Sequence, residues 1–338
     1  MRIDLILESS APPGTIAELG RLAESYGLGG IWVSSMLDAR DPFMNFAELA
    51  RTSDRIRMGP IAVSPYELHP LKMATSLLTL NEASHGRAQI VVGGGGGTMT
   101  AMAMKPERRV QAVREAVEIL KLAGTGRPIN YEGEIFKIRG YHPAWAKSPP
   151  PVIYVGANRD KMLHMGSRYA DGIMLSDKMV PQVREARTII DSVLDSAGRP
   201  RNTFRLNNFW AWHVKESREE AQREARIWLA LRGVLLRPNH VYFMNEADCD
   251  VVEAKRQNFF TALRKRSPEI EGVPERIIES LVENLTSCSS IDDIDKEIER
   301  LRQFEAAGLT EIALRIYADP AATIRLIGER VIPALGPR

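Results

Sequence analysis

Five consecutive glycines, Gly93–Gly97, follow the strand-like residues "QIVV" and precede a stretch rich in threonine and methionine. A dinucleotide fingerprint G-x-G-x-x-G that started at either of the first two glycines would end on Thr98 or Met99, so neither start fits. A P-loop is also excluded, because no lysine follows the run before Lys105. Backbone without side chains still lets a flat ligand lie directly against it. Two interpretations stay open, a ligand-contacting loop and a plain flexible loop.

Three titratable side chains near the ends of apolar runs have the chemistry to move a proton: Glu8, Asp38 and His69. Two of them have a structural alternative, because Glu8 can satisfy a neighbouring amide or lysine and His69 before Pro70 can cap a loop. No zinc-ligand spacing and no G-x-S-x-G elbow occurs in the sequence. The polar groups near these run ends are mostly glycine backbone, amides and hydroxyls. A bound cofactor therefore fits the chemistry better than a side-chain nucleophile or a metal.

Eight short apolar runs predict the strands that would position these residues. Several are continuous runs of Ile, Leu and Val, which is typical of parallel strands buried on both faces. Helical periodicity lies between them, and eight strand–helix units favour an α/β fold of the (β/α)8 TIM barrel type over an open doubly wound sheet. In such a barrel the loops that follow the strands share one face, where ligands bind. The predicted strands are Ile3–Ser9, Gly30–Ser35, Arg57–Val63, Gln89–Gly93, Val152–Val155, Gly172–Ser176, Arg205–Val214 and Glu311–Ile316.

Two connections are longer than a simple barrel needs. The residues "YEGEIFKIRGYHPAWAKSPPP" after the fourth strand indicate a small hairpin and a proline-rich loop. Between the seventh and eighth strands, a helical and charged segment over residues 230–285 is interpreted as an insertion packed over the barrel. No linker composition flanks this segment, so residues 1–338 are predicted to form a single domain.

The overall composition limits the partners. The 338 residues include 45 basic and 43 acidic side chains, a net charge of +2, with no basic block. Nucleic acid and membrane surfaces are therefore not expected as partners. The expected partner is a small organic molecule. The two cysteines, Cys249 and Cys288, lack metal or redox spacing and indicate a reducing compartment. Neither a membrane span nor the apolar core of a signal peptide occurs, so a cytoplasmic location is expected.

The segment "HPLKMATSLLTLNEASHGRAQIVVGGGGG" (residues 69–97) resembles the luciferase-like flavin and deazaflavin oxidoreductases. That superfamily has a His-Pro pair, an alanine-rich helix, a Thr-Leu-Asp/Asn-Glu-x-Ser-x-Gly-Arg turn, a strand and then a glycine loop. Within it, "MGPIAVSPY" and "VIYVGANRDKMLHMGSRYADGIML" resemble the F420-dependent methylene-tetrahydromethanopterin reductases. The resemblance covers residues 1–180 and returns at 286–335, whereas residues 205–285 match only in predicted layout.

The resemblance implies a tricyclic cofactor at the mouth of the barrel. A bulge after the third strand, with a cis peptide bond between Ile61 and Ala62, would press on one face of the ring system, and the glycine run would let the ring or its ribityl chain lie against backbone. Gly156, Ala157 and Asn158 match the family's phosphate-binding turn, where N–H groups at a helix start meet the anion. A homodimer is expected by analogy. The cofactor-binding residues implied are Ser35, Ile61, Ala62, Val63, Gly93, Gly94, Gly95, Gly96, Gly156, Ala157, Asn158 and Ser176.

The chain departs from the family after the second strand. Many relatives place an Asp-His or Glu-His pair there, where this chain has Ser35 and Met36. The leading interpretation is a reductase that moves hydride between reduced coenzyme F420 and a one-carbon tetrahydropterin (methylene-tetrahydromethanopterin or methylene-tetrahydrofolate) or a related acceptor. Three alternatives stay open: an FMN-dependent monooxygenase, a cofactor-free reductase that takes hydride from NADH, and a non-catalytic flavin-binding barrel.

Overall fold

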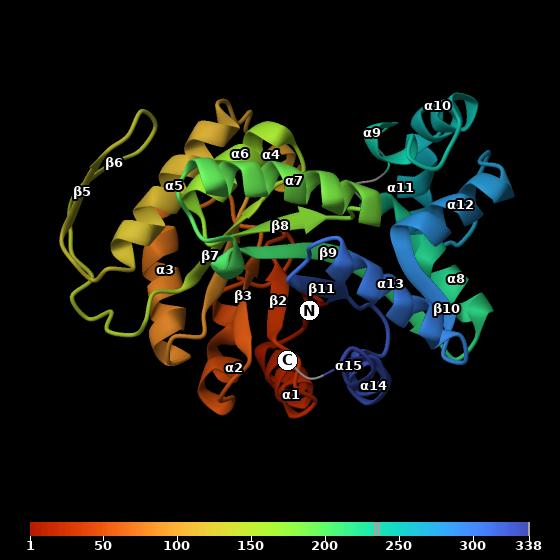
Figure 1. Cartoon of the computed structure of the whole chain (residues 1–338), viewed down its shortest axis with the longest axis horizontal. Helices are drawn as coiled ribbons and strands as arrows, with labels where there is room; N and C mark the ends of the chain where they lie inside the picture. Colours follow the sequence, from red (N-terminus) through yellow and green to blue (C-terminus); the bar gives the residue numbers. More distant parts are fainter. Residues whose placement is uncertain (233–234, 236, 337–338) are drawn as a thin grey trace.

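A parallel barrel forms the centre of the computed structural model, which describes residues 1–232, 235 and 237–336 (Figure 1). The barrel strands are β1 (Arg2–Leu7), β2 (Gly30–Ser34), β3 (Arg57–Ile61), β4 (Gln89–Val92), β7 (Val152–Gly156), β8 (Gly172–Ser176), β9 (Arg205–Lys215) and β11 (Glu311–Arg315). They follow one another in the order β3-β2-β1-β11-β9-β8-β7-β4, and neighbours pair in parallel. Continuous apolar sequence fits this arrangement because both faces of each strand are covered; in β1 five of six residues are buried. The predicted (β/α)8 barrel is confirmed.

Strands β3 and β4 close the barrel at a seam without a continuous ladder. Isolated bridges join Met58 to Ala88 and Val63 to Val92. Hydrogen bonds flank the gap, with the N–H of Val63 donating to the carbonyl of Val91 at 2.9 Å. The strand predicted to run to residue 63 is therefore interrupted, and Val63 returns to the sheet after a bulge.

The residues of the bulge explain the interruption. Pro60 has no N–H to donate to a ladder, and the peptide bond between Ile61 and Ala62 is cis, as the resemblance implied. Gly59 lets the two strands approach, because a Cβ at this position would lie 1.6 Å from the main-chain oxygen of Gln89. The bulge thus directs Ala62 toward the end of the barrel where the strands finish.

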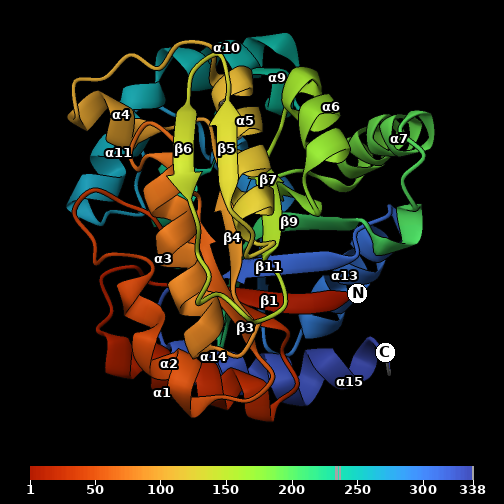
Figure 2. The ribbon, with the colours of Figure 1, turned by 90° about the vertical axis from the view of Figure 1, so that its left-hand side faces the viewer.

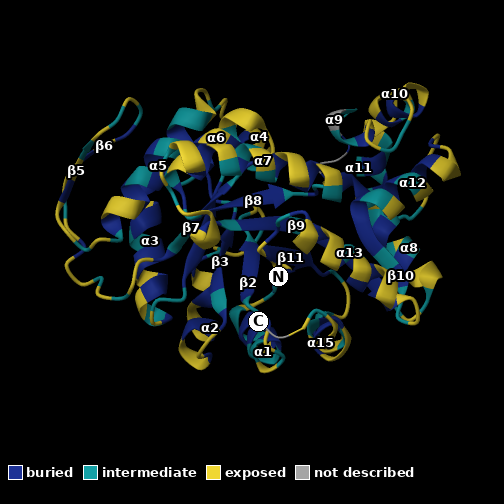
Figure 3. Ribbon diagram, viewed as in Figure 1, coloured by how far each residue is buried: buried dark blue, intermediate teal, exposed yellow. Residues whose placement is uncertain are grey.

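Helices cover the outside of the barrel, with their apolar faces inward and their polar faces exposed (Figure 3). In the first of them, Ile16, Leu19 and Ala23 lie on the buried face, as expected for helical spacing. These outer helices are α1 (Pro13–Ser25), α2 (Ala47–Thr52), α3 (Pro70–Ala83), α4 (Gly97–Ala101), α5 (Arg109–Ala123), α6 (Asp160–Tyr169), α7 (Val180–Ser196), α13 (Ile294–Ala306), α14 (Pro320–Leu326) and α15 (Ile332–Ala334). None of the helices in the described ranges is long and apolar enough to cross a membrane.

The hairpin predicted after the fourth strand is present as β5 (Ile129–Glu132) and β6 (Lys137–Tyr141), an antiparallel pair that lies against α3 and α5 (Figure 2). The buried carboxylate of Glu115 on α5 accepts hydrogen bonds from the N–H groups of residues 134–136 in the hairpin turn. The hydroxyls of Thr75 and Tyr141 lie 3.1 Å apart and join β6 to α3.

A helical region with its own apolar core lies between β9 and β11. Its elements are α8 (Arg218–Trp228), α9 (Arg237–His240), α10 (Glu246–Ala254), α11 (Arg256–Lys265), α12 (Glu275–Leu285) and the strand β10 (Thr286–Ser290). Residues 233, 234 and 236 of the predicted insertion lie outside the described residues. Strand β10 was not predicted, because "TSCSS" has no apolar alternation. It pairs in parallel with residues 211–215, the far half of the long strand β9, whose near half pairs inside the barrel.

A polar cluster fills the end of the barrel where the strands begin. The indole N–H of Trp32 donates to Asp4 at 2.9 Å, and the hydroxyl of Tyr154 donates to Glu311 at 2.6 Å. Arg205 also donates to Glu311, at 2.8 Å. Burial and the nearby Glu311 carboxylate raise the pKa of Tyr154, so it stays a neutral donor. These contacts join side chains of five strands across this end of the barrel, and the loops that follow the strands lie at the opposite end.

Candidate active site

The loops at the carboxyl ends of the strands enclose a cavity of about 700 Å³ that we call the glycine cavity. It opens on the loops after β2, β3, β4, β7 and β8, so side chains from five separate strand ends meet there. The lining residues are Ser35, Met36, Leu37, Asp38, Ala62, Glu67, Gly93, Gly94, Gly95, Gly96, Gly97, Thr98, Ala101, Gly156, Asn158 and Ser176. Ile61, Val63 and Ala157, which the resemblance implied, are buried in the walls behind the lining.

Main chain rather than side chain forms one wall of the glycine cavity. A Cβ added at Gly93 would touch the Cβ of Ala62 at 3.0 Å, so the bulge after β3 and the glycine loop are in close contact. Nothing lies within 4 Å of where a Cβ at Gly96 or Gly97 would be, so these residues face open space. This wall fits a flat ring system such as a deazaflavin or a flavin, because the ring can lie against backbone that carries no side chains.

The turn after β7 is held by its own hydrogen bonds. The N–H of Ala157 donates to the carbonyl of Met174 at 3.0 Å, so this donor is already used inside the sheet. The Asn158 side chain accepts from the N–H of Ser176 at 2.9 Å and donates to the carbonyl of Ser176 at 3.2 Å. Asn158 and Ser176 therefore clamp the ends of β7 and β8 together. The first turn of α6, whose leading N–H groups have no acceptor within the helix, follows directly.

Glu67 is a lining residue that the sequence reasoning missed. Its carboxylate accepts from the N–H of Ser64 at 3.4 Å and hydrogen-bonds with the hydroxyls of Ser35 and Thr98. Partial burial raises the pKa of Glu67 above its ordinary value, although these hydrogen bonds oppose the change. It is the acidic residue of the loop "SPYELHP" after β3, and that position was the available signal.

The three predicted proton-transfer residues lie in three different surroundings. Asp38 is exposed and lines the glycine cavity. His69 does not line it; its Nδ1 accepts from the N–H of Leu71 at 3.2 Å at the start of α3, and its ring packs on Phe136. The structure thus gives His69 a helix-capping role.

Glu8, at the end of β1, is paired with Arg315, whose guanidinium donates to its carboxylate at 2.7 Å. Partial burial disfavours the carboxylate, but the charge of Arg315 and its hydrogen bond outweigh this and lower the pKa of Glu8. The side chain is 45% exposed, so the carboxylate remains accessible. In the sheet, β1 lies between β2, whose loop lines the glycine cavity, and β11.

Residues 2–311 match the family of luciferase-like monooxygenases. The chain belongs to this luciferase-like family of oxidoreductases. It is 29% identical over 318 residues to a 5,10-methylenetetrahydromethanopterin reductase of Archaeoglobus fulgidus, which covers 93% of this chain and 94% of the relative.

Solved structures share the fold of the luciferase-like chain. The coenzyme F420-dependent tetrahydromethanopterin reductase of Methanopyrus kandleri superposes with a TM-score of 0.80 at 21% identity, covering 98% of each chain. An F420-dependent secondary alcohol dehydrogenase, solved with an F420–acetone adduct, superposes with a TM-score of 0.77 at 16% identity, covering 99% of this chain and 98% of the other. At these identities the likeness concerns the fold.

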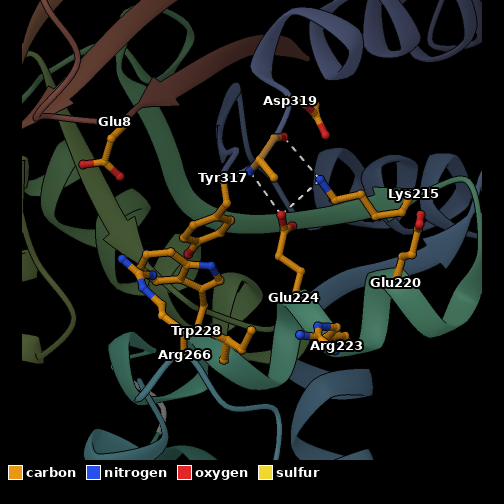
Figure 4. Close-up of a pocket in the computed structure, with 11 residues that line it drawn as sticks. Glu8, Lys215, Glu220, Arg223, Glu224, Trp228, Arg266, Tyr317 and Asp319 are labelled. Carbon is orange, nitrogen blue, oxygen red and sulfur yellow. Dashed lines mark hydrogen bonds and ion pairs between the residues drawn. The ribbon is translucent and has the colours of Figure 1, made fainter. Parts of the chain in front are cut away.

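The luciferase-like chain has a second cavity, of about 590 Å³, on the neighbouring arc of the barrel mouth (Figure 4). We call it the aromatic cavity. It lies between the loops after β1, β9 and β11 and the helices α8 and α11. The lining residues are Glu8, Lys215, Glu220, Arg223, Glu224, Ile227, Trp228, Arg266, Tyr317, Ala318 and Asp319.

Proposed function

We propose that the protein is a reductase that transfers hydride between reduced coenzyme F420 and a one-carbon tetrahydropterin, such as methylene-tetrahydromethanopterin or methylene-tetrahydrofolate. The observation that carries the proposal is the glycine cavity, a slot walled by side-chain-free backbone at the carboxyl ends of the strands. The chain is also similar over almost its full length to a 5,10-methylenetetrahydromethanopterin reductase. A deazaflavin bound in the slot would supply the hydride.

The residues of the chain would supply the remaining requirements. Reducing a methylene bridge between two nitrogens to a methyl group adds a hydride to carbon and a proton to nitrogen. Glu67 is suited to hold that proton, because its burial favours the neutral acid. Glu8 is suited to stay ionised beside Arg315 and to stabilise positive charge on the acceptor. Two carboxyl groups with pKa values shifted in opposite directions can therefore divide the acid and electrostatic roles.

The first test is an anaerobic titration of the purified protein with coenzyme F420, FMN and NADH, followed by absorbance and fluorescence. We expect binding of F420, and hydride transfer to methylene-tetrahydromethanopterin or methylene-tetrahydrofolate. Gly97→Val places a side chain in the open space of the glycine cavity and should weaken F420 binding at least tenfold. Gly14→Val, at the start of α1 and outside both cavities, is the matched control and should leave the Kd within twofold.

Other outcomes of the titration would replace the proposal. Binding of FMN with oxygen consumption would identify a monooxygenase. Binding of NADH alone would indicate a cofactor-free reductase, for which Ser35 and Met36 in place of the acid–histidine pair are the supporting residues. Binding of none of the three would contradict the reductase.

A further inference from the structure

The aromatic cavity has a wall built from a stack of flat groups. The rings of Tyr317 and Trp228 are stacked, with centroids 4.5 Å apart, and the guanidinium of Arg266 lies 4.4 Å from the Trp228 centroid on the indole face. On the other side, His213 stacks on Tyr317 at 4.9 Å. Figure 4 shows Tyr317, Trp228 and Arg266 one against the next. The Tyr317 ring thus lies between the indole and the imidazole, and the indole lies between the phenol and the guanidinium.

Arg266 comes to the stack through an unusual backbone conformation. It follows the last residue of α11 with a φ of 53°, in the left-handed region that residues other than glycine adopt uncommonly. Its guanidinium forms no ion pair or side-chain hydrogen bond with any of the described residues. Because no described residue pairs with the guanidinium, its N–H groups remain available to a ligand, in the fork arrangement that suits a carboxylate or carbonyl oxygen.

The charged lining residues carry both signs, and three of the seven form ion pairs with described residues. Lys215 pairs with Glu224 at 3.1 Å, and Glu224 also accepts from the Nδ1–H of His213 at 2.7 Å. Glu8 is paired with Arg315. Four charged lining residues form no ion pair within the described part of the chain. Two of them are hydrogen-bond donors, Arg223 and Arg266, and two are acceptors, Glu220 and Asp319. A ligand that carries only anionic groups would meet these acids, whereas a ring with both donor and acceptor edges would find partners for each.

We propose that the aromatic cavity binds the hydride acceptor, that the acceptor is a flat heterocycle with hydrogen-bond donors and a carbonyl or carboxylate oxygen, and that Arg266 recognises this oxygen. Reduced pterins belong to this chemical class. The inference rests on the proposed function in calling the ligand the acceptor. Glu8 lines this cavity just after β1, and β1 neighbours β2, whose loop lines the glycine cavity, so the two cavities belong to adjacent strand ends.

The test is a calorimetric titration of the full-length protein with 5-formyl-tetrahydrofolate, a reduced pterin that is stable in air. Arg266→Gln removes the guanidinium while keeping a polar side chain, and we expect the Kd for the pterin to rise at least tenfold. Arg264→Gln makes the same change on the same helix, but Arg264 does not line the cavity and bonds to Thr261, so its Kd should stay within twofold of the wild type. The Kd for F420, measured by its fluorescence, should be unchanged in both variants.

Two results would overturn the inference: equal pterin affinities for Arg266→Gln and Arg264→Gln, or competition between F420 and the pterin for one cavity. Absence of pterin binding to the wild type would overturn it as well. The proposed function fails separately. If the pterin binds as predicted but no hydride passes from F420, the ligand site stands and the reductase does not. If hydride transfer occurs while Arg266→Gln binds the pterin normally, the inference fails alone.

Discussion

The seam between β3 and β4 makes a strong prediction about Gly59. In Gly59→Ala the new methyl carbon would lie 1.6 Å from the main-chain oxygen of Gln89, and real Cβ contacts essentially never fall below 3.0 Å. The obstacle is backbone, which no side-chain rotation can relieve. The two strands must therefore separate by well over an ångström at this point.

The cost follows from what the seam holds together. Three main-chain hydrogen bonds cross it: Met58 N–H to the Arg87 carbonyl, Val63 N–H to the Val91 carbonyl, and Gly93 N–H to the Val63 carbonyl. At about 1 kcal/mol each, their loss costs about 3 kcal/mol. Overpacking adds about 1–3 kcal/mol. The expected destabilisation of about 4–6 kcal/mol is comparable with the whole free energy of unfolding of many domains, about 5–15 kcal/mol.

Urea unfolding followed by circular dichroism measures this change, and the matched control is Gly97→Ala. Gly97 begins α4 with nothing within 4 Å of its added Cβ, so the same methyl group should leave the free energy of unfolding unchanged within about 1 kcal/mol. If Gly59→Ala failed to accumulate as soluble protein while Gly97→Ala did, the direction of the prediction would hold. The reasoning is refuted if Gly59→Ala unfolds within about 1 kcal/mol of the wild type.

Three further predictions concern carboxyl groups. Glu67→Gln keeps the size of the side chain but removes its proton, so kcat should fall about 100-fold and the loss of activity with rising pH should disappear; an unchanged kcat and pH profile would exclude Glu67 as the acid. Arg315→Gln removes the cation beside Glu8, so the pKa of Glu8, followed by carbon NMR of labelled glutamate, should rise; a constant pKa would contradict the ion pair. Burial disfavours the Glu115 charge, but hydrogen bonds from Gln111 and the hairpin N–H groups lower its pKa, so its contribution to stability is present above the ordinary value of 4.5 and is lost as pH falls through the lowered one. Glu115→Gln should therefore lower the free energy of unfolding by about 2 kcal/mol at neutral pH and make this free energy fall less as the pH is lowered. If the variant and the wild type had equal urea midpoints at neutral pH and again in acid, this account would be contradicted.

The sequence predicted the barrel because several of its strands, covered on both faces, are continuous apolar runs separated by helical periodicity. Strand β10 was missed for the opposite reason: it pairs with the outer half of β9, and its sequence "TSCSS" is polar. The glycine loop was predicted to face a ligand from composition and resemblance together, and the structure places it in the lining of a cavity. Glu67 was missed because a single acid in a loop carries no periodic signal, and its hydrogen-bond partners Ser35 and Thr98 are distant in sequence.

The aromatic cavity could not be predicted from the sequence for a related reason. Trp228, Arg266 and Tyr317 come from three elements spread over ninety residues, and only the packing of α8 and α11 over the barrel brings them together. His69, by contrast, has a local capping signal before Pro70, and the structure gives it that local role. Sequence patterns thus predict contacts within one helix or strand more reliably than contacts between elements that are distant in the sequence.

Strand β9 belongs both to the barrel and to the helical region between β9 and β11. Its first residues are hydrogen-bonded within the barrel, and its last residues carry β10 and, at Lys215, reach the aromatic cavity. Because β9 is continuous and pairs with β10, the helical region is tied to the barrel by hydrogen bonds along this strand. Replacing residues 216–285 with the corresponding segment of a relative would change the outer wall of the aromatic cavity, with Trp228 and Arg266, while leaving the glycine cavity intact. Under the proposed function and the acceptor site inferred above, the fold would separate the part that diversifies among acceptors from the part that holds one ring system.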